Sequence, residues 1–197
     1  MKKFLVVFLT VIMVGAGLIG CRKLPGEVDN PGEYKFAAGK WTINDVKLWD
    51  TQKSFALTYG MYLEQVQEIY GEGQLLIEDG HVKIFDYPDH DMIRLYFREN
   101  RLARMVVNDF NGFRYATFRG IGVDATLEMI ENAYGKALDE QNGAYTYIVR
   151  VSGKNAGELL FLPNAASGTT SIMIGDYGAD LGEAIKKYTS ERDKTGQ

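Results

Sequence analysis

LEQVQEIYG (63–71) and LEMIENAYG (127–135) are two versions of one pattern, 64 residues apart in the chain. Without a gap, this offset aligns Leu63 with Leu127, Glu64 with Glu128, Val66 with Ile130, Tyr70 with Tyr134 and Gly71 with Gly135. The same offset aligns Ile84 with Ile148, Leu95 with Leu159, Phe97 with Phe161 and Asn100 with Asn164, and a shift to 67 then aligns Val107 with Ile174 and Asp109 with Asp176. Because the matching positions are mostly apolar, turn or cap residues, they indicate an internal duplication.

Each copy of the pattern predicts a helix. Leu63, Val66 and Tyr70 have the i, i+3, i+7 spacing of one helical face, and Leu127, Ile130 and Tyr134 repeat it. The glycine that ends each copy is typical of the left-handed residue after a helix. Asp124 is in a position to cap the start of the second helix.

Three strand-like segments follow each predicted helix. They are HVKIFDY (81–87), MIRLYFRE (92–99) and RLARMVVN (101–108) in the first copy, and AYTYIVRV (144–151), GELLFLP (157–163) and TTSIMIG (169–175) in the second. Short polar turns between alternating strands favour antiparallel pairing. A further segment, WTINDVKLW (41–49), is expected to add a strand ahead of the first helix.

The sequence therefore predicts an α+β fold built from two consecutive αβββ units, about 36–109 and 110–179. These units are expected to form one antiparallel sheet with both helices packed on one face, leaving Tyr, Phe and Arg side chains on the other. Residues 180–197 are expected to form a C-terminal helix and tail, because Leu181, Ala184, Ile185 and Tyr188 have helical spacing.

The chain begins with a segment typical of export. Lys2 and Lys3 precede an apolar run that ends in Leu18-Ile19-Gly20-Cys21, and Cys21 is the one cysteine of the sequence. The run resembles the signal peptide and lipobox of bacterial lipoproteins. This resemblance implies a signal peptide over 1–20, cleavage between Gly20 and Cys21, and a diacylglyceryl group and further acylation on Cys21. The polar stretch that follows, residues 21–35, is expected to be a flexible tether.

Composition argues against several classes of function. Removal of residues 1–20 leaves 177 residues, with 20 basic and 26 acidic side chains and a net charge of −6. This charge argues against nucleic-acid binding. With Cys21 acylated, no thiol remains for disulfides, thiol catalysis or a zinc cluster. We expect no cofactor.

The repeated pattern, a helix ending in Tyr-Gly followed by strands with aliphatic-Phe-x-x-Asn, resembles the β-lactamase-inhibitor-protein-like superfamily. It is also similar to small outer-membrane lipoproteins of the SmpA/OmlA kind and to Gram-positive lipoproteins with two such units. The resemblance covers about residues 55–176 and implies protein binding through a concave sheet. Gly71 and Gly135 lack the proline that often follows in those families. No functional residue is carried over.

One polar loop could in principle bind a metal ion. DYPDHD (86–91) contains Asp86, Asp89, His90 and Asp91, which are possible ligands for a hard cation or zinc. Pro88 and the polar run favour a solvated loop between strands. No G-x-S-x-G elbow and no glycine-rich phosphate loop is present, so the sequence favours a protein that is not an enzyme.

The segment between the two units is the strongest candidate for partner binding. NDFNGFRYATFRG (108–120) combines aromatic and arginine side chains, the types that dominate protein interfaces: Phe110, Phe113, Arg114, Tyr115, Phe118 and Arg119. The alternative is that one face of YATF packs into the core while the arginines extend to solvent.

The sequence thus favours a lipid-anchored, non-enzymatic binding or assembly module outside the cytoplasm. It is expected to be held to the cell membrane, or to the outer membrane of a Gram-negative cell, by the lipid on Cys21, and to recognise an envelope or surface protein. The alternatives are an envelope structural or stress scaffold, and a metal-dependent hydrolase that uses the 86–91 loop.

Overall fold

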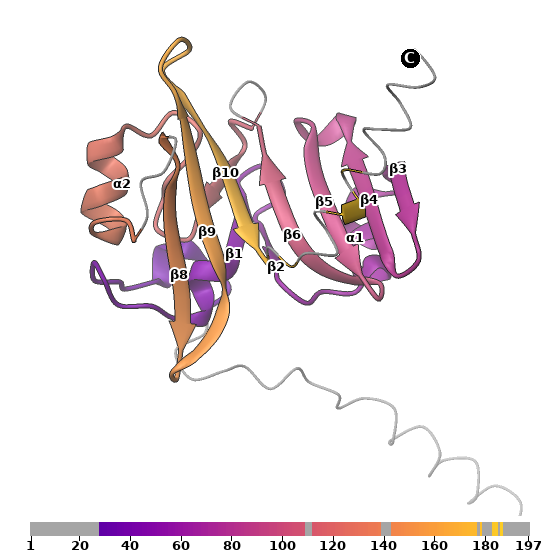
Figure 1. The fold of residues 1–197 in the computed structure, drawn as a ribbon, viewed down its shortest axis with the longest axis horizontal. Coiled ribbons are helices and arrows are strands. Elements are labelled where there is room, and N and C mark those ends of the chain that lie inside the picture. Colours follow the sequence, from indigo (N-terminus) through magenta and orange to yellow (C-terminus); the bar gives the residue numbers. More distant parts are fainter. Residues whose placement is uncertain are drawn as a thin grey trace, which may run out of the picture.

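The computed structural model describes residues 28–108, 112–138, 143–176, 178, 183–184 and 186. Seven strands of this part of the chain form one antiparallel sheet in the order β3-β4-β5-β6-β10-β9-β8 (Figure 1). Their bounds are β3 Gln74–Asp79, β4 Val82–Tyr87, β5 Ile93–Arg98, β6 Arg101–Val107, β8 Tyr145–Val151, β9 Lys154–Asn164 and β10 Thr169–Gly175. The last strands of the two predicted units, β6 and β10, therefore pair at the centre of the sheet.

A second, three-stranded antiparallel sheet has the order β2-β1-β7. Its strands are β1 Lys47–Asp50, β2 Phe55–Thr58 and β7 Tyr115–Thr117. Strand β1 pairs with β2 on one side and, on the other, with β7, which follows it by more than sixty residues of sequence. Short 3-10 turns at η1 Pro31–Glu33, η2 Ile43–Val46 and η3 Pro88–His90 complete the described elements.

The two helices lie where the repeated pattern predicts them. Helix α1 spans Leu63–Tyr70 and α2 spans Leu127–Tyr134, and each ends at a glycine with positive φ. The cap of α2 is Thr126, whose side chain accepts a hydrogen bond from the amide of Met129 at 3.3 Å, and not Asp124. Leu127 is 39% exposed, so the buried face of α2 consists of Ile130, Ala133 and Tyr134.

One large hydrophobic cluster contains residues from both helices and both sheets. Alternate residues of the large sheet point into it, among them Leu95 on β5, Leu159 on β9 and Ile174 on β10. A smaller cluster lies on the opposite face, where Ala184 packs with Val82, Ile84, Tyr96 and Ala103. The period of two along the strands thus divides the side chains between the two faces.

The expectation of an α+β fold with antiparallel strands is confirmed, and the six strands predicted after the helices are all present. Three strands were not predicted: β2, β3 and β7. The predicted strand at 41–49 is wrong over residues 41–46, because Thr42 caps η2 and the strand begins at Lys47.

Part of the predicted tether belongs to the folded domain. The amide of Val28 donates to Asn44 Oδ1, and Lys47 Nζ donates to the carbonyl of Val28 at 2.9 Å. The Tyr34 ring is buried, and its hydroxyl donates to Asp45. Residues 28–35 are therefore held by contacts that the sequence alone does not reveal.

Several expectations fall outside the described residues. They are the signal peptide at 1–20, the lipid site at Gly20 and Cys21, Phe110, and most of the C-terminal segment 180–197. Within the described part of the chain, neither helix has the length and apolar character that a membrane crossing requires.

Candidate functional site

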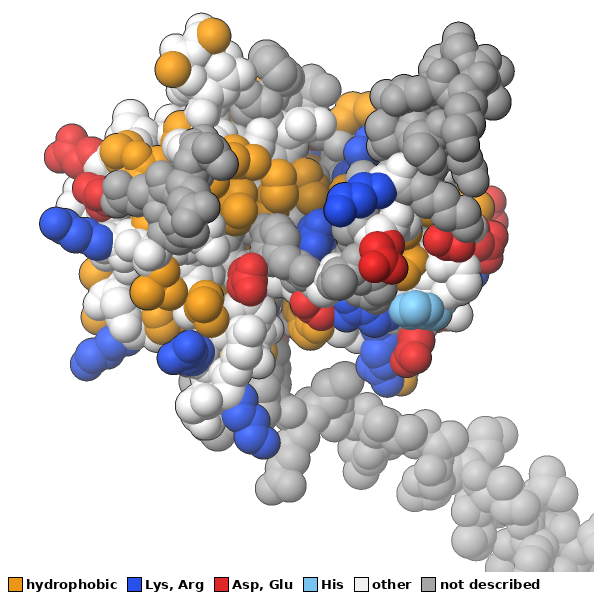
Figure 2. Space-filling model, in the orientation of Figure 1, with side chains coloured by type: hydrophobic (Ala, Val, Ile, Leu, Met, Phe, Trp, Pro, Cys, Tyr) orange, Lys and Arg blue, Asp and Glu red, His pale blue; other side chains and the backbone are white. Residues whose placement is uncertain are grey.

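The outer face of the large sheet, opposite the main core cluster, carries a row of aliphatic side chains. Met173 on β10 pairs with Val106 on β6 and with Leu160 on β9, and Leu162 and Ile148 lie near them on the same face. All five are only partly buried. Figure 2 shows hydrophobic side chains gathered over this part of the sheet, with basic side chains beside them. A partly exposed apolar patch with a polar border is typical of an interaction site.

The arginines of this face are held in fixed positions. Arg94 makes a bidentate contact with Asp86, at 2.6 Å from Nε and 2.9 Å from Nη2. The hydrogen bonds that Arg94 donates to the Asp86 carboxylate raise the pKa of Arg94. Arg104 donates from Nε to the carbonyl of Asp176, and its guanidinium lies 5.3 Å from the centre of the Tyr96 ring. The aliphatic row is thus flanked by charges that are already ordered.

The expected partner-facing patch between the units is not exposed. Arg114, Tyr115, Phe118 and Arg119 are each no more than 6% exposed, whereas Phe113 is 63% exposed. The reason is that this segment contains β7, which pairs with β1 and turns its side chains into the core. The alternative expectation was correct about the aromatic rings and wrong about the arginines, which point inward to buried carboxylates.

Arg119 lies at one end of the β1–β7 pair, and its guanidinium is fully satisfied. Nε donates to Asp45 Oδ1 at 2.6 Å, and Nη2 donates to Asp45 Oδ2 and the carbonyl of Lys40. Nη1 donates to the carbonyls of Ala37 and Ala133. These five acceptors match the five N–H groups of an arginine. Burial disfavours the charge, but the contact with Asp45 outweighs it, and the pKa of Arg119 is raised.

Arg114 forms an equivalent pair with Asp50 at the other end. Nη2 donates to Asp50 Oδ2 at 2.5 Å and Nε to Oδ1 at 3.2 Å, and the Tyr70 hydroxyl also donates to Oδ2. Burial alone would raise the pKa of Asp50, but the hydrogen bonds from Arg114, the Lys53 amide and Tyr70 lower it. Burial raises the pKa of Tyr70, and its contact with Asp50 adds to the effect.

His90 joins this cluster with both ring nitrogens engaged. Arg114 Nη1 lies 3.3 Å from Nδ1, and the carbonyl of Tyr70 lies 2.9 Å from Nε2. Because a guanidinium donates and does not accept, Nδ1 is the acceptor and Nε2 carries the proton. The imidazole therefore holds the 86–91 loop against α1, and neither nitrogen is available to a substrate in this arrangement.

The other members of the 86–91 loop do not converge with His90. Asp86 belongs to β4 and is paired with Arg94, while Pro88–His90 form a 3-10 turn in which Asp89 is exposed. Asp91 follows this turn with a left-handed backbone. Among the residues that the structure describes, no three His, Cys, Asp or Glu side chains are grouped closely enough to hold a metal ion.

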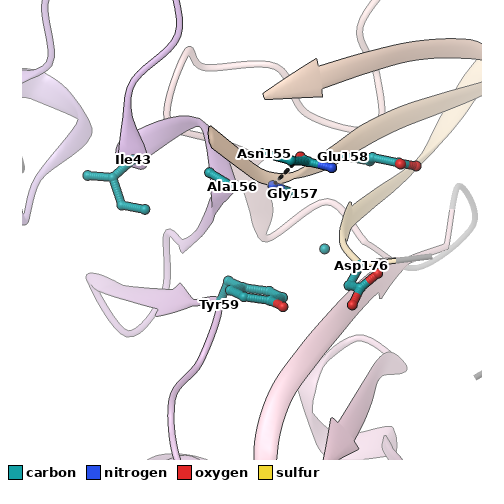
Figure 3. A pocket seen from close by; sticks show the side chains of 8 residues that line it. Ile43, Tyr59, Asn155, Ala156, Gly157, Glu158 and Asp176 are labelled. Carbon is teal, nitrogen blue, oxygen red and sulfur yellow. Dashed lines mark hydrogen bonds between the residues drawn. The ribbon is translucent and has the colours of Figure 1, made fainter. Parts of the chain in front are cut away.

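A groove of about 360 Å³ opens between the two sheets, at the start of β9 and the end of β10. Ile43, Tyr59 and Ala156 provide its apolar side, and Asn155, Glu158 and Asp176 its polar side (Figure 3). Asp176 Oδ2 accepts a hydrogen bond from Arg98 at 2.6 Å. Burial raises the pKa of Tyr59, and the neighbouring Asp176 carboxylate adds to this effect.

The sequence interpretation missed the residues of this groove and most of the outer face. Strict alternation along β9 and β10 could have identified Leu160 and Met173 as outward-facing, since their neighbours Leu159, Phe161 and Ile174 are core residues. Nothing local could have identified the groove, because its lining comes from four separate parts of the chain.

Comparison of the chain with protein-family models, with curated proteins and with solved structures gives no match.

Proposed function

We propose that this protein is a lipid-anchored, extracytoplasmic binding module that recognises a protein partner through the outer face of its large sheet. The observation that supports this most directly is the partly exposed aliphatic row of Val106, Met173 and Leu160, which crosses three strands. Binding would remove this row from water and so gain the hydrophobic free energy that dominates protein association. The Arg94 side chain is partly exposed and is already ordered by Asp86, so it could contact a partner at little further entropic cost.

The polar clusters of the domain support a binding role over a catalytic one. Asp50 and Asp45 are each paired with a buried arginine, and both nitrogens of His90 are engaged. A general base must be able to accept a proton from a substrate within hydrogen-bond reach. In this conformation those three groups are occupied by structural contacts instead.

The lipid anchor rests on the lipobox-like segment that ends at Cys21. Six residues of chain lie between Cys21 and Val28, the first described residue, and the seven steps from Cys21 to Val28 span at most about 25 Å when extended. An anchored domain would therefore stay close to the membrane surface. This favours a partner that is itself in the envelope or on the cell surface.

We further propose that the domain arose by duplication of one αβββ unit, with both helices on one face of the large sheet. Three observations support this: α1 and α2 end at glycines of nearly identical backbone angles, Val66 and Ile130 belong to one core cluster, and an Asp–Arg pair lies at each end of β1–β7. Replacement of residues 127–135 by the sequence of 63–71 should leave the circular dichroism spectrum unchanged. A chimera that does not fold would argue against equivalent units.

Site-specific crosslinking tests the binding face. A photoreactive amino acid at Leu160, on the outer face, should capture one dominant envelope protein in cells that carry the anchored protein. The matched control is the same amino acid at Asn132, an exposed residue of α2. The proposal fails if Leu160 captures nothing, or if both positions capture the same proteins.

A charge placed on the face provides a second readout. Leu160→Glu should abolish crosslinking from a photoreactive group at Met173, because a desolvated carboxylate is costly in an apolar interface. Asn132→Glu should leave it intact. The melting temperature of each variant shows whether the domain is still folded.

A further inference from the structure

The groove between the two sheets has a chemistry that differs from that of the aliphatic row. Its apolar side is formed by Ile43, Ala156 and the ring of Tyr59, which is 37% exposed. Gly157 and Gly175 also line the groove with their backbone. At about 360 Å³ the groove falls in the size range of small-ligand sites.

Gly175, at the edge of the groove, is required for the close pairing of β10 with β6. Its φ is +142°, and a Cβ atom added there would lie 2.2 Å from the carbonyl oxygen of Ala103 on the neighbouring strand β6. Every residue other than glycine would therefore push β6 and β10 apart. Across β10 and β9, Gly175 is paired with Glu158, and both residues line the groove.

The polar side is rich in hydrogen-bond acceptors. The Glu158 carboxylate is half-buried and has no hydrogen-bond or ion-pair partner in the described structure. Asp176 has one oxygen bound to Arg98 and the other to the amide of Gly178, which leaves further lone pairs on each. Asn155 lies between the apolar side and Glu158 (Figure 3). A ligand that complements this side must donate hydrogen bonds.

We infer that this groove binds a guanidinium or ammonium group carried on an aliphatic stem. The charged head would lie between Glu158 and Asp176, where two carboxylates offer it hydrogen bonds. The stem would pack on Ile43 and Ala156, and the face of Tyr59 would add a cation–π contact. The Arg98–Asp176 contact at 2.6 Å shows that one of these carboxylates accepts a hydrogen bond from a guanidinium through one of its oxygens.

The test compares two ligands of nearly the same shape, one with a charged guanidinium and one with a neutral urea group. The full-length chain in a neutral detergent is titrated with N-acetyl-arginine amide and with N-acetyl-citrulline amide, and binding is followed by ligand-observed NMR. The arginine compound should bind at least tenfold more tightly, and its advantage should shrink as salt is added. Equal affinity for the two compounds would overturn the inference.

Variants locate the binding. Glu158→Gln should remove the preference for arginine, whereas Glu72→Gln, at an exposed acid outside the groove, should keep it. Tyr59→Phe should keep most of the affinity because the ring remains, and Tyr59→Ala should lose it. Melting temperatures check the fold. A preference that survives Glu158→Gln would contradict the assignment.

Two further probes distinguish the source of the cation. A blocked Gly-Arg-Gly peptide that binds more tightly than agmatine would point to an arginine of a protein partner, and the reverse order would point to a free amine. Failure of both to bind would overturn the inference. The inference stands apart from the proposed protein-binding face, because its probes are small molecules and its readout does not depend on crosslinking at Leu160.

Discussion

At the scale of single residues, the most consequential feature is a pair of buried ion pairs at the two ends of the β1–β7 ladder. Asp45 and Asp50 lie on one strand and its preceding turn, and Arg119 and Arg114 flank the other strand. Charges are costly to bury unless their hydrogen bonds are complete. Here the pairs meet that condition, and they fix where the 112–120 segment crosses the domain.

Replacement of Arg119 should be strongly destabilising. Arg119→Met leaves the Asp45 carboxylate buried without its cation and removes donors from three backbone carbonyls, so we expect a loss of about 3–5 kcal/mol in the free energy of unfolding. Urea unfolding measures it. Arg150→Met, at an exposed arginine, is the control and should change stability by less than about 0.5 kcal/mol. Similar losses for the two variants would contradict the role of the pair.

Asp50 should make stability depend on pH. Its pKa is lowered in the folded protein, so the unfolded chain takes up the proton more readily as the pH falls. The stabilisation is complete above the ordinary carboxyl value of about 4 and is lost as the pH falls through the folded value. Asp50→Asn should therefore flatten the decline in stability on acidification, besides lowering stability at neutral pH. The measurement is the free energy of unfolding of the parent and of Asp50→Asn between pH 6 and pH 2. If the two decline in parallel, the prediction is wrong.

At the scale of elements, helix ends are set by local sequence. Gly71 and Gly135 follow the two helices with φ of 78° and 85° and ψ near −169°. This backbone region is essentially restricted to glycine. The two Tyr-Gly ends therefore stop the helices at the same point, and their tyrosines reach the small sheet through hydrogen bonds to Asp50 and Thr117.

Gly135→Ala should cost about 1–3 kcal/mol of stability through backbone strain. A Cβ atom there would come no closer than 3.7 Å to another atom, so the cost is conformational and not a clash. Thermal unfolding measures the effect. Asn132→Ala, at an exposed site in the same helix, should change stability by less than about 0.5 kcal/mol. A Gly135→Ala variant as stable as the parent would show that the turn can adopt another conformation.

The elements that the sequence predicted are those whose apolar residues recur with a clear helical or strand periodicity. The helices at 63–70 and 127–134, and strands such as Ile93–Arg98 and Thr169–Gly175, match the predicted spans within one residue. The missed strands β2, β7 and β3 are short or irregular: β7 has three residues, and β3 carries a bulge between Leu75 and Ile77. Such strands form because a neighbouring strand pairs with them, and this pairing cannot be predicted from the local sequence pattern.

At the scale of the whole molecule, the two faces of the large sheet have different surroundings. One face carries the main core cluster, while the other is partly covered by Ala184 over β4–β6 and leaves Leu160 and Met173 partly exposed. If the proposed lipid on Cys21 is present, the domain begins within about 25 Å of the membrane surface.

The anchor is tested by one substitution. Cys21→Ser removes the sulfur that a diacylglyceryl group requires, so the protein should leave the membrane fraction while its thermal unfolding stays that of the parent. A wash with carbonate distinguishes lipid anchoring from peripheral association. Persistence of the Cys21→Ser protein in the washed membranes, with its signal cleaved, would refute the lipid anchor.

The sequence by itself determined the two helices, six strands of the large sheet and the division of their side chains between two faces. These follow from the spacing of apolar residues, with a period of 3.6 in helices and 2 in strands, which can be seen within a short stretch of sequence. Only the tertiary structure decided that Arg114 and Arg119 are buried and that Tyr59 meets Glu158 and Asp176 around a groove. The physical reason is distance along the chain: Arg114 and Asp50 are 64 residues apart and Arg119 and Asp45 are 74 apart. Their charges have no partner until β1 and β7 are paired.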